Sequence, residues 1–387
     1  MNDPWKVKGR YHVTRQIPFI DLKTASTALQ ASLQARMNAV LDHGQYIMGP
    51  EVAELENSLQ ALTGSPYCIT VSSGTEALLI SLMALGVGPG DEVITTPFTF
   101  IATVEVIVLL GATPVFVDVE ADTCNIDATL VEAAITERTR AIIPVSLYGQ
   151  VPDMTEINQL AHTHGLKVIE DAAQSFGATY QGKKSCNVSG IACTSFFPSK
   201  PLGCFGDGGA IFTDDEVIAN ACREIRVHGQ SQRYVHTRVG VGGRMDTLQC
   251  AVVLAKLERF EWEVGQRLLL GESYNARMDE IGIMRVQQKP DRDSVFAQYT
   301  IFVDQRDRVQ AELESRGIPT AVHYPVPLNE QPAYRHLGDS KRTPVSATIA
   351  KRVMSLPMSP DLALEDQAYI VDKLGEVVAR FSEPLEV

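Results

Sequence analysis

The stretch Lys167-Val168-Ile169-Glu170-Asp171-Ala172-Ala173-Gln174 is a short apolar run that ends in two acidic residues and a small-residue turn. It is one of several Val- and Ile-rich runs that alternate with helical patterns between about residues 67 and 227. Such alternation is typical of a mostly parallel sheet covered by helices on both faces. The stretch therefore predicts an α/β fold with Asp171 at the carboxyl end of a strand, where open α/β sheets bind ligands.

The alternation continues on both sides of this stretch. We expect strands at 67–72, 92–95, 113–117, 141–145, 167–170, 191–195 and 209–213, and helices at 26–42, 50–63, 74–85, 101–110, 153–164 and 216–227. A long helix from 247 to about 280 ends the pattern. After it we expect strands at 298–303 and near 321, and helices at 307–316, 346–354 and 364–381. This change predicts three parts: an N-terminal arm (1–25), a large α/β domain (26–265) and a small C-terminal α+β domain (266–387).

Composition narrows the possible functions. The chain has 387 residues, 45% hydrophobic and 21% charged, as in ordinary globular proteins, and its formal net charge is −13. This acidity argues against nucleic acid or an anionic membrane as a partner. The sequence shows neither a membrane span nor an apolar signal segment, so we expect a cytoplasmic protein. Its seven scattered cysteines form no C-x-x-C pair, and no motif predicts a metal site.

Lys200 follows Thr194-Ser195-Phe196-Phe197-Pro198-Ser199, about thirty residues after Asp171. A lysine in an apolar segment can lose its proton near neutrality and attack a carbonyl, and an aspartate can keep a pyridine nitrogen protonated. These are the two groups that a pyridoxal phosphate (PLP) enzyme needs most. Each also has an ordinary explanation, because a lysine before proline is often a solvated loop residue and Asp-Ala-Ala often caps a helix.

Further segments suit the same cofactor. Ser72-Ser73-Gly74-Thr75 closes one expected strand and opens a helix, which favours phosphate binding, although it also reads as a plain N-cap. Phe100 could lie against a planar ring, or belong to the core. Ser195 ends a strand and could add a second phosphate contact. The glycine-rich run 203–209 permits a tight backbone path beside Lys200, or forms a simple hairpin turn.

Several stretches resemble the DegT/DnrJ/EryC1/StrS family of sugar-nucleotide aminotransferases, which have the fold type I (aspartate aminotransferase-like) PLP-enzyme architecture. The resemblance runs from about residue 17 to near the C-terminus. The matching stretches are Phe19-Ile20-Asp21-Leu22, Gly49-Pro50-Glu51-Val52, Ser73-Gly74-Thr75-Glu76-Ala77-Leu78, Gly90-Asp91-Glu92-Val93-Ile94, Glu170-Asp171-Ala172-Ala173-Gln174, Gly206-Asp207-Gly208-Gly209-Ala210, His228-Gly229 and the segment around Lys200.

The resemblance implies roles for individual residues. Lys200 would carry the cofactor covalently, and Asp171 would pair with its pyridine nitrogen. The other cofactor contacts would be Gln174 near the ring hydroxyl, Gly74, Thr75 and Ser195 at the phosphate, and Phe100 over the ring face. A lysine at position 200 also separates this chain from the related sugar dehydratases, which have histidine there.

A closer similarity lies in 144–150, 195–204 and 321–325, which resemble the family branch that aminates UDP-2-acetamido-2-deoxy-3-oxo-D-glucuronate for bacterial surface polysaccharide (O-antigen). The resemblance implies that Arg244, His323 and Tyr324 bind this substrate. Arg244 could instead form an ion pair at a helix start, and His323 could be a core residue.

One position departs from the family pattern. The family usually has Gly-x-Asn-x-Arg before the long helix, and its Asn reaches the cofactor phosphate of the neighbouring subunit. This chain has Gly240-Val241-Gly242-Gly243-Arg244, so Gly242 takes the place of the Asn. That side-chain contact is lost, and backbone N–H groups or water would have to replace it.

The resulting hypothesis is a transaminase that takes an amino group from L-glutamate, passes through pyridoxamine phosphate, and aminates the C3 ketone of the sugar. The resemblance also implies a homodimer with active sites at the subunit interface. Amination at another sugar carbon, such as C4, stays open, as does a non-catalytic regulatory protein of the same fold. A nicotinamide dehydrogenase is disfavoured because the glycine fingerprint is missing.

Overall fold

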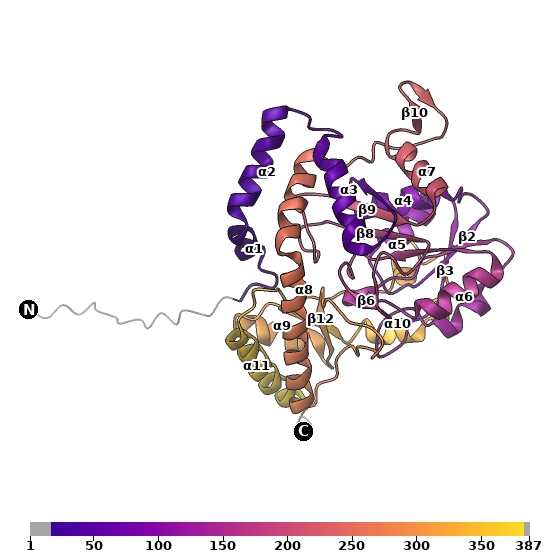
Figure 1. The fold of residues 1–387 in the computed structure, drawn as a ribbon. Helices are drawn as coiled ribbons and strands as arrows, with labels where there is room; N and C mark the ends of the chain where they lie inside the picture. Colours follow the sequence, from indigo (N-terminus) through magenta and orange to yellow (C-terminus); the bar gives the residue numbers. More distant parts are fainter. Residues whose placement is uncertain (1–16, 383–387) are drawn as a thin grey trace, which may run out of the picture.

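The computed structural model describes residues 17–382, so most of the expected N-terminal arm lies outside the described residues. A seven-stranded sheet in the order β1-β9-β8-β5-β4-β2-β3 forms the centre of the larger part (Figure 1). Its strands are β1 (Tyr67–Val71), β2 (Glu92–Thr95), β3 (Thr113–Phe116), β4 (Thr139–Ile142), β5 (Lys167–Asp171), β8 (Ile191–Ser195) and β9 (Gly209–Thr213). Only β9 runs antiparallel to its neighbours, so the predicted mostly parallel sheet is confirmed.

Helices cover both faces of this sheet. They are α3 (Pro50–Thr63), α4 (Gly74–Ala84), α5 (Ala102–Leu109), α6 (Met154–His164), α7 (Glu216–Arg226) and the start of α8 (Thr247–Ile281). The helices α1 (Leu22–Ala28) and α2 (Gln30–His43) precede them, and α2 packs on the outer side of α8 (Figure 1). Alternation along β8 supplies both cores: Ile191 and Cys193 pack with α4 and α7, whereas Ala192 packs with α3 and α8. The sheet is therefore buried on both sides, which explains the continuous apolar runs in its strands.

The C-terminal part is built on the far end of α8 (Figure 1). It contains α9 (Arg306–Ser315), α10 (Pro344–Ile349), α11 (Leu364–Ser382) and the antiparallel pair β12 (Tyr299–Phe302) and β13 (Val353–Leu356). Leu270, Tyr274 and Met278 of α8 lie in its apolar core with Ile301 and Leu313. Because α8 continues through residue 265, the proposed domain boundary lies within a helix and stays a prediction.

Short elements complete the chain. They are the strands β6 (Thr179–Tyr180), β7 (Lys183–Lys184), β10 (Gln230–Gln232) and β11 (Val235–His236), and the 3-10 helices Ala128–Leu130, Glu132–Ala134, Leu147–Gly149, Leu328–Glu330 and Ser340–Arg342. Within residues 17–382, no helix combines the length and hydropathy needed to cross a membrane. All seven cysteines are buried free thiols.

Three expected elements were wrong in detail. The helix expected at 26–42 is two helices, because the backbone of Leu29 leaves the helical conformation between α1 and α2. The helix expected at 346–354 ends at Ile349, and 353–356 instead form β13 beside β12. The strand expected near Ala321 is a single bridge to Ser355. In the last two cases, pairing with a distant strand decides the local structure.

Candidate active site

A cavity of about 460 Å³ lies at the carboxyl ends of β5 and β8. Nine of the ten predicted site residues line it: Gly74, Thr75, Phe100, Asp171, Gln174, Ser195, Lys200, His323 and Tyr324. They come from six separate stretches of the chain, which the sheet and the C-terminal part bring together. The structure therefore assembles the predicted constellation in one place, and the role of each residue stays a prediction.

One end of the cavity is formed by the N-terminus of α4. Ser73 caps this helix, and its Oγ accepts a hydrogen bond of 3.1 Å from the backbone N–H of Glu76. A Cβ on Gly74 would lie 2.7 Å from Cβ of Ser195, so only glycine lets the helix start approach the end of β8 this closely. The first N–H groups of a helix have no intrahelical acceptor, and together with the hydroxyls of Thr75 and Ser195 they suit a phosphate.

Asp171 lies at the base of the cavity and is 6% exposed. Its Oδ2 accepts a hydrogen bond of 2.8 Å from Oγ1 of Thr103, and its Oδ1 accepts one of 3.2 Å from the backbone N–H of Ala173. Burial raises the pKa of this carboxyl, while the Thr103 and Ala173 bonds and the nearby Lys200 lower it. A buried carboxylate with these two hydrogen bonds can accept another one, for example from a pyridinium N–H.

Lys200 supplies the amine of the site. Among the described residues its Nζ has no hydrogen-bond or ion-pair partner within bonding distance. Burial lowers the pKa of the Lys200 amine, and the charge of Asp171 opposes this shift. The result is an amine that loses its proton more readily than a surface lysine, which is what nucleophilic attack on a carbonyl requires.

Gln174 is oriented by two tyrosines. Its Oε1 accepts a hydrogen bond of 2.7 Å from the backbone N–H of Tyr148, and its Nε2 lies 3.2 Å from the hydroxyl of Tyr324. The Tyr148 hydroxyl in turn donates to the backbone carbonyl of His323. These contacts tie the C-terminal part of the cavity wall to the sheet and fix which end of the Gln174 amide faces the cavity.

Aromatic side chains form another part of the cavity wall. Phe100 is 52% exposed and its ring centroid lies 6.2 Å from that of Tyr324, so its face is free to cover a planar ligand. His323 stacks on Phe19 at 6.3 Å, and its Nδ1 lies 3.1 Å from Oγ of Ser355. Burial and the charge of Lys200 lower the pKa of His323 to about 4, so the ring is neutral near pH 7.

Arg244 is the predicted residue that the structure does not bring into the cavity. It is half-buried before α8 and does not line the pocket. Gly242 also lies outside it, where an added Cβ would meet Cε1 of His228 at 3.2 Å.

Conversely, Thr103 and Gln298 belong to the site, and the sequence analysis missed both. Neither lies in a recognisable motif, and Thr103 reads as an ordinary residue of an apolar helix.

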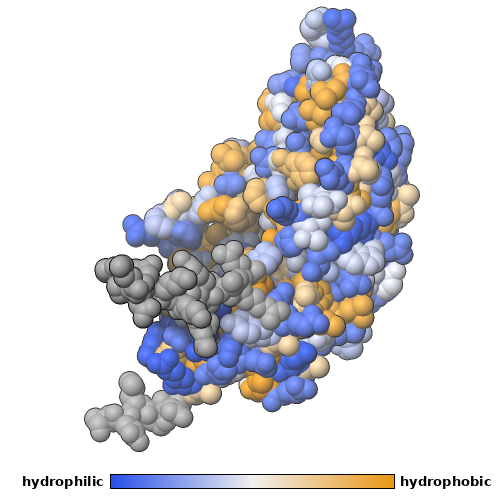
Figure 2. All heavy atoms as spheres, turned by 90° about the vertical axis from the view of Figure 1, so that its left-hand side faces the viewer, coloured by the Kyte–Doolittle hydropathy of each residue, from blue (hydrophilic) through white to orange (hydrophobic). Residues whose placement is uncertain are grey.

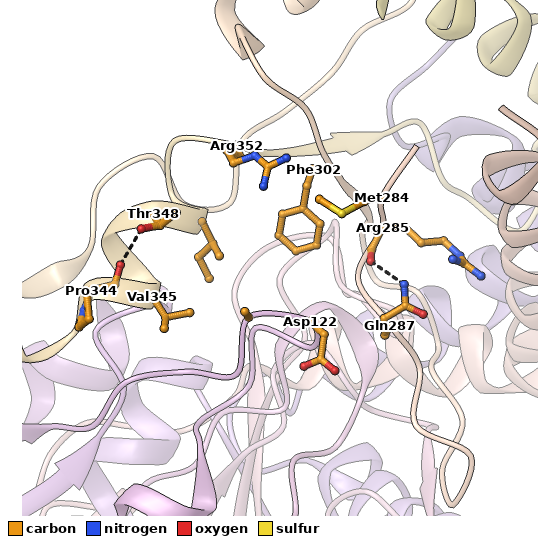
Figure 3. A pocket seen from close by; sticks show the side chains of 11 residues that line it. Asp122, Met284, Arg285, Gln287, Phe302, Pro344, Val345, Thr348 and Arg352 are labelled. Carbon is orange, nitrogen blue, oxygen red and sulfur yellow. Dashed lines mark hydrogen bonds between the residues drawn. The ribbon is translucent and has the colours of Figure 1, made fainter. Parts of the chain in front are cut away.

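A second cavity, of about 570 Å³, is larger but carries no comparable chemistry (Figure 3). It lies between α10 and the segment Met284–Gln287, with Phe302 on its wall. Its two arginines are ion-paired, Arg285 with Asp279 and Arg352 with Asp304. Its lining residues include no lysine, cysteine or histidine, so this cavity offers a substrate no amine, thiol or imidazole.

The first cavity fits PLP. A helix N-terminus with hydroxyls faces the phosphate end, a buried carboxylate can meet the ring nitrogen, an exposed phenyl face can cover the ring, and an unpaired amine can meet the aldehyde. No other group of described residues combines these four features. The conclusion that this cavity fits PLP therefore rests on the groups of this chain that line it.

Comparison with known proteins agrees with this geometry. Residues 27–375 match the model of the DegT/DnrJ/EryC1/StrS aminotransferase family. The chain is 56% identical over 347 residues to the UDP-2-acetamido-2-deoxy-3-oxo-D-glucuronate aminotransferase of Pseudomonas aeruginosa, which covers 89% of this chain and 96% of that protein.

Two solved structures have the same fold. The S. venezuelae DesV, crystallised in complex with a ketimine intermediate, has a TM-score of 0.92 and 39% identity over 96% of this chain and 100% of its own. Ntda from Bacillus subtilis, with bound cofactor PMP, has a TM-score of 0.88 and 30% identity over 94% of this chain and 85% of its own. The predicted fold type I architecture and the PLP cofactor are confirmed.

Proposed function

Because the chain belongs to the DegT/DnrJ/EryC1/StrS aminotransferase family, we propose that it aminates the C3 ketone of UDP-2-acetamido-2-deoxy-3-oxo-D-glucuronate, with L-glutamate as the amino donor. The protein is a PLP-dependent sugar aminotransferase. The observation that supports this particular sugar is the 56% identity to the P. aeruginosa enzyme over 89% of the chain. The product would serve the synthesis of a diaminated uronic acid for bacterial surface polysaccharide.

The residues of the cavity account for the chemistry as follows. Bound PLP supplies an electron sink that weakens the bonds next to the transferred nitrogen. Asp171 keeps a positive charge on the ring nitrogen, and Thr103 holds its carboxylate in place. Lys200, once its amine is free, takes a proton from the donor's α-carbon and returns one at the sugar carbon. Phe100, Tyr324 and His323 shield this amine from bulk water.

The direct test separates the two halves of the reaction. The purified holoenzyme is mixed with L-glutamate, and loss of the cofactor's visible absorbance reports amination of PLP. The UDP-linked 3-keto uronate is then added, with a 4-keto nucleotide sugar in a parallel sample. We expect only the 3-keto sugar to restore the absorbance. Restoration by the 4-keto sugar alone would contradict the proposed substrate, and a preparation without bound cofactor would contradict the proposed enzyme.

Replacement of Lys200 tests the catalytic assignment itself. Lys200→Ala should abolish turnover and the absorbance of the covalently held cofactor, since no other described lysine lines the cavity. Lys184→Ala, on the small β6–β7 hairpin, controls for the loss of a lysine outside the cavity. Wild-type turnover in the Lys200 variant would remove this residue from the role.

We also propose that the enzyme is a homodimer with active sites between subunits. The described cavity has one cation, Lys200, against two carboxylates, Asp171 and Asp207, whereas the cofactor and the sugar nucleotide are both anionic. Hydrophobic residues also reach the surface on the face that carries α1 and α2 (Figure 2). Within α2, Leu41 is 55% exposed. Sedimentation of the holoenzyme at micromolar concentration should show twice the chain mass, and a monomer would refute this proposal.

A further inference from the structure

Gln298 immediately precedes β12 and lines the active-site cavity. Along β12, Tyr299 and Ile301 point into the apolar core of the C-terminal part. Because strand side chains alternate, Thr300 between them lies on the opposite face. Thr300 is bonded to Ser355 (Oγ1 to Oγ, 3.0 Å), which in turn lies 3.1 Å from Nδ1 of His323. Gln298 extends this polar row to the cavity, where it lies among the lining residues with His323.

Among residues 17–382, the side-chain amide of Gln298 has no hydrogen-bond partner. Its Oε1 is fully buried, yet among the described residues nothing donates a hydrogen bond to it. A buried amide oxygen without a partner costs about 1–3 kcal/mol, so such groups are rare and call for a water or a ligand. The other amide in the site, that of Gln174, is bonded at both ends. Gln298 therefore retains hydrogen-bonding capacity that the described part of the chain does not use.

Gln298 also separates two spaces. Besides the active-site cavity it lines a small pocket of about 20 Å³, together with Tyr148, Gln150, Gln287 and Ser294. That volume has room for about one water molecule, which needs polar partners of this kind. An amide has an acceptor end and a donor end, so one end can meet such a water while the other faces the active site.

The position of Gln298 indicates substrate rather than cofactor. The groups suited to PLP come from the large sheet: Asp171 ends β5, Ser195 ends β8 and Gly74 starts α4. Gln298 and His323 belong to the C-terminal part, on the other side of the cavity. A reacting sugar has to approach Lys200 from a side that the cofactor does not occupy, and among the described residues the C-terminal part provides such a side. The neutral ring of His323 makes this wall uncharged.

We propose that the Gln298 amide hydrogen-bonds an uncharged group of the keto sugar, a hydroxyl or an acetamido group on a carbon next to the reacting ketone, and so selects the substrate. This inference rests on the proposed function and deepens it. An uncharged amide distinguishes between sugars through this hydrogen bond. A sugar that lacks the matching group leaves the buried amide without a hydrogen-bond partner, and it therefore binds more weakly. Gln298 thus acts on the sugar half of the reaction and not on the donor half.

The experiment measures both halves separately in the holoenzyme. Gln298→Ala should raise the keto-sugar concentration needed for half-maximal re-oxidation of the aminated cofactor by about three- to tenfold, the range for one uncharged hydrogen bond. Its rate with L-glutamate and its cofactor absorbance should match wild type. Calorimetric titration with the aminated UDP-sugar product should show weaker binding by a similar factor. Gln298→Glu, which preserves the shape, should lose binding as well.

Gln159→Ala is the matched control, because this glutamine is exposed on α6 and lines neither the active-site cavity nor the small pocket. Equal losses in the glutamate and sugar halves would overturn the proposal, as would wild-type sugar binding in both Gln298 variants. A fall in unfolding free energy without a change in sugar binding would assign the amide to an internal water. If wild type aminates a different keto sugar, the proposed substrate fails, and the same comparison with that sugar decides the role of Gln298 independently.

Discussion

The charge of Asp171 depends on a residue outside every motif. Thr103, in the first turn of α5, donates to Oδ2 of Asp171 at 2.8 Å, and both residues are buried. Burial favours the neutral acid, whereas this bond favours the carboxylate. The ionised form that a protonated ring needs is therefore maintained jointly by the Thr103 hydroxyl and by the positive charge in the site.

Replacing Asp171 should be far more damaging than replacing its neighbour. Asp171→Asn should lower kcat by at least about a hundredfold, because a neutral amide cannot hold a positive charge at the ring nitrogen.

Thr103→Val should raise the pKa of Asp171 and move the acidic limb of the pH–kcat profile to higher pH. Thr103→Ser retains the hydroxyl and serves as its control. An unchanged profile in Thr103→Val would show that the bond does not influence the carboxylate.

His323 should make the stability of the protein depend on pH. Its pKa is lowered from 6.5 to about 4 in the folded protein, first by burial. Between these values the unfolded chain binds more protons than the folded one, so the free energy of unfolding falls as pH falls from 6.5 toward 4. His323→Gln should flatten this dependence in urea unfolding at pH 7, 5.5 and 4.5. His162→Gln, exposed on α6, controls for losing a histidine elsewhere, and an equally steep fall in His323→Gln would refute the assignment.

At the scale of elements, α8 connects the sheet to the C-terminal part and carries two glycines with opposite surroundings. An added Cβ at Gly271 would lie 2.1 Å from the ring of Phe296, whereas at Gly265 it would meet nothing within 4 Å. Gly271 therefore permits a close packing contact. Gly265 has no such role among the described residues, and it only lowers the helix propensity of α8.

The two glycines should respond oppositely to the same substitution. Gly271→Ala should lower the unfolding free energy by about 1–3 kcal/mol, because overpacking outweighs the gain in helix propensity. Gly265→Ala should raise it by about 0.5–1 kcal/mol, since the gain is then unopposed. Urea unfolding at pH 7 measures both. If both variants were stabilised, Phe296 would be moving aside at little cost.

At the scale of the whole molecule, a cluster of charges fastens the segment 287–295 to the sheet. Asp153, at the start of α6, lies 2.6 Å from both Nζ of Lys289 and Nη2 of Arg292. Lys289 also pairs with Glu120, and the guanidinium of Arg292 lies 4.6 Å from the ring centroid of Tyr180. This segment leads directly into Gln298 and β12, so the cluster fixes the wall of the active site.

Breaking this cluster should cost more than breaking an exposed pair. Asp153→Ala leaves the buried Arg292 with Asp291 and the Val151 carbonyl as partners, and it should lower the unfolding free energy by about 1–3 kcal/mol. Asp279→Ala removes the partner of Arg285, but the Asp279 side chain is 63% exposed and its loss should cost below about 1 kcal/mol. Denaturant unfolding of both variants tests the difference. Equal effects would mean that burial adds nothing to the cluster.

Several features could be read from the sequence because their physical cause is local. The apolar runs around Ile169 and Ile191 predict buried strands, a strand end places Asp171 at the ligand edge, and Gly74 belongs to a helix start that favours phosphate binding. Lys200 and Asp171 stand out because few other functions need an apolar lysine and a strand-end carboxylate together. The family resemblance added Gln174 and the substrate residues.

Tertiary structure alone decided the rest, because those features depend on contacts between segments far apart in the chain. Residues 353–356 form a strand only where β12 offers its edge. Thr103 becomes a partner of Asp171 through the packing of α5, and Gln298 enters the site through the seating of the C-terminal part on the sheet. Arg244 lies outside the cavity of its own chain, and its role in substrate binding stays a prediction. Local composition determines which residues can do chemistry, and packing determines which of them meet.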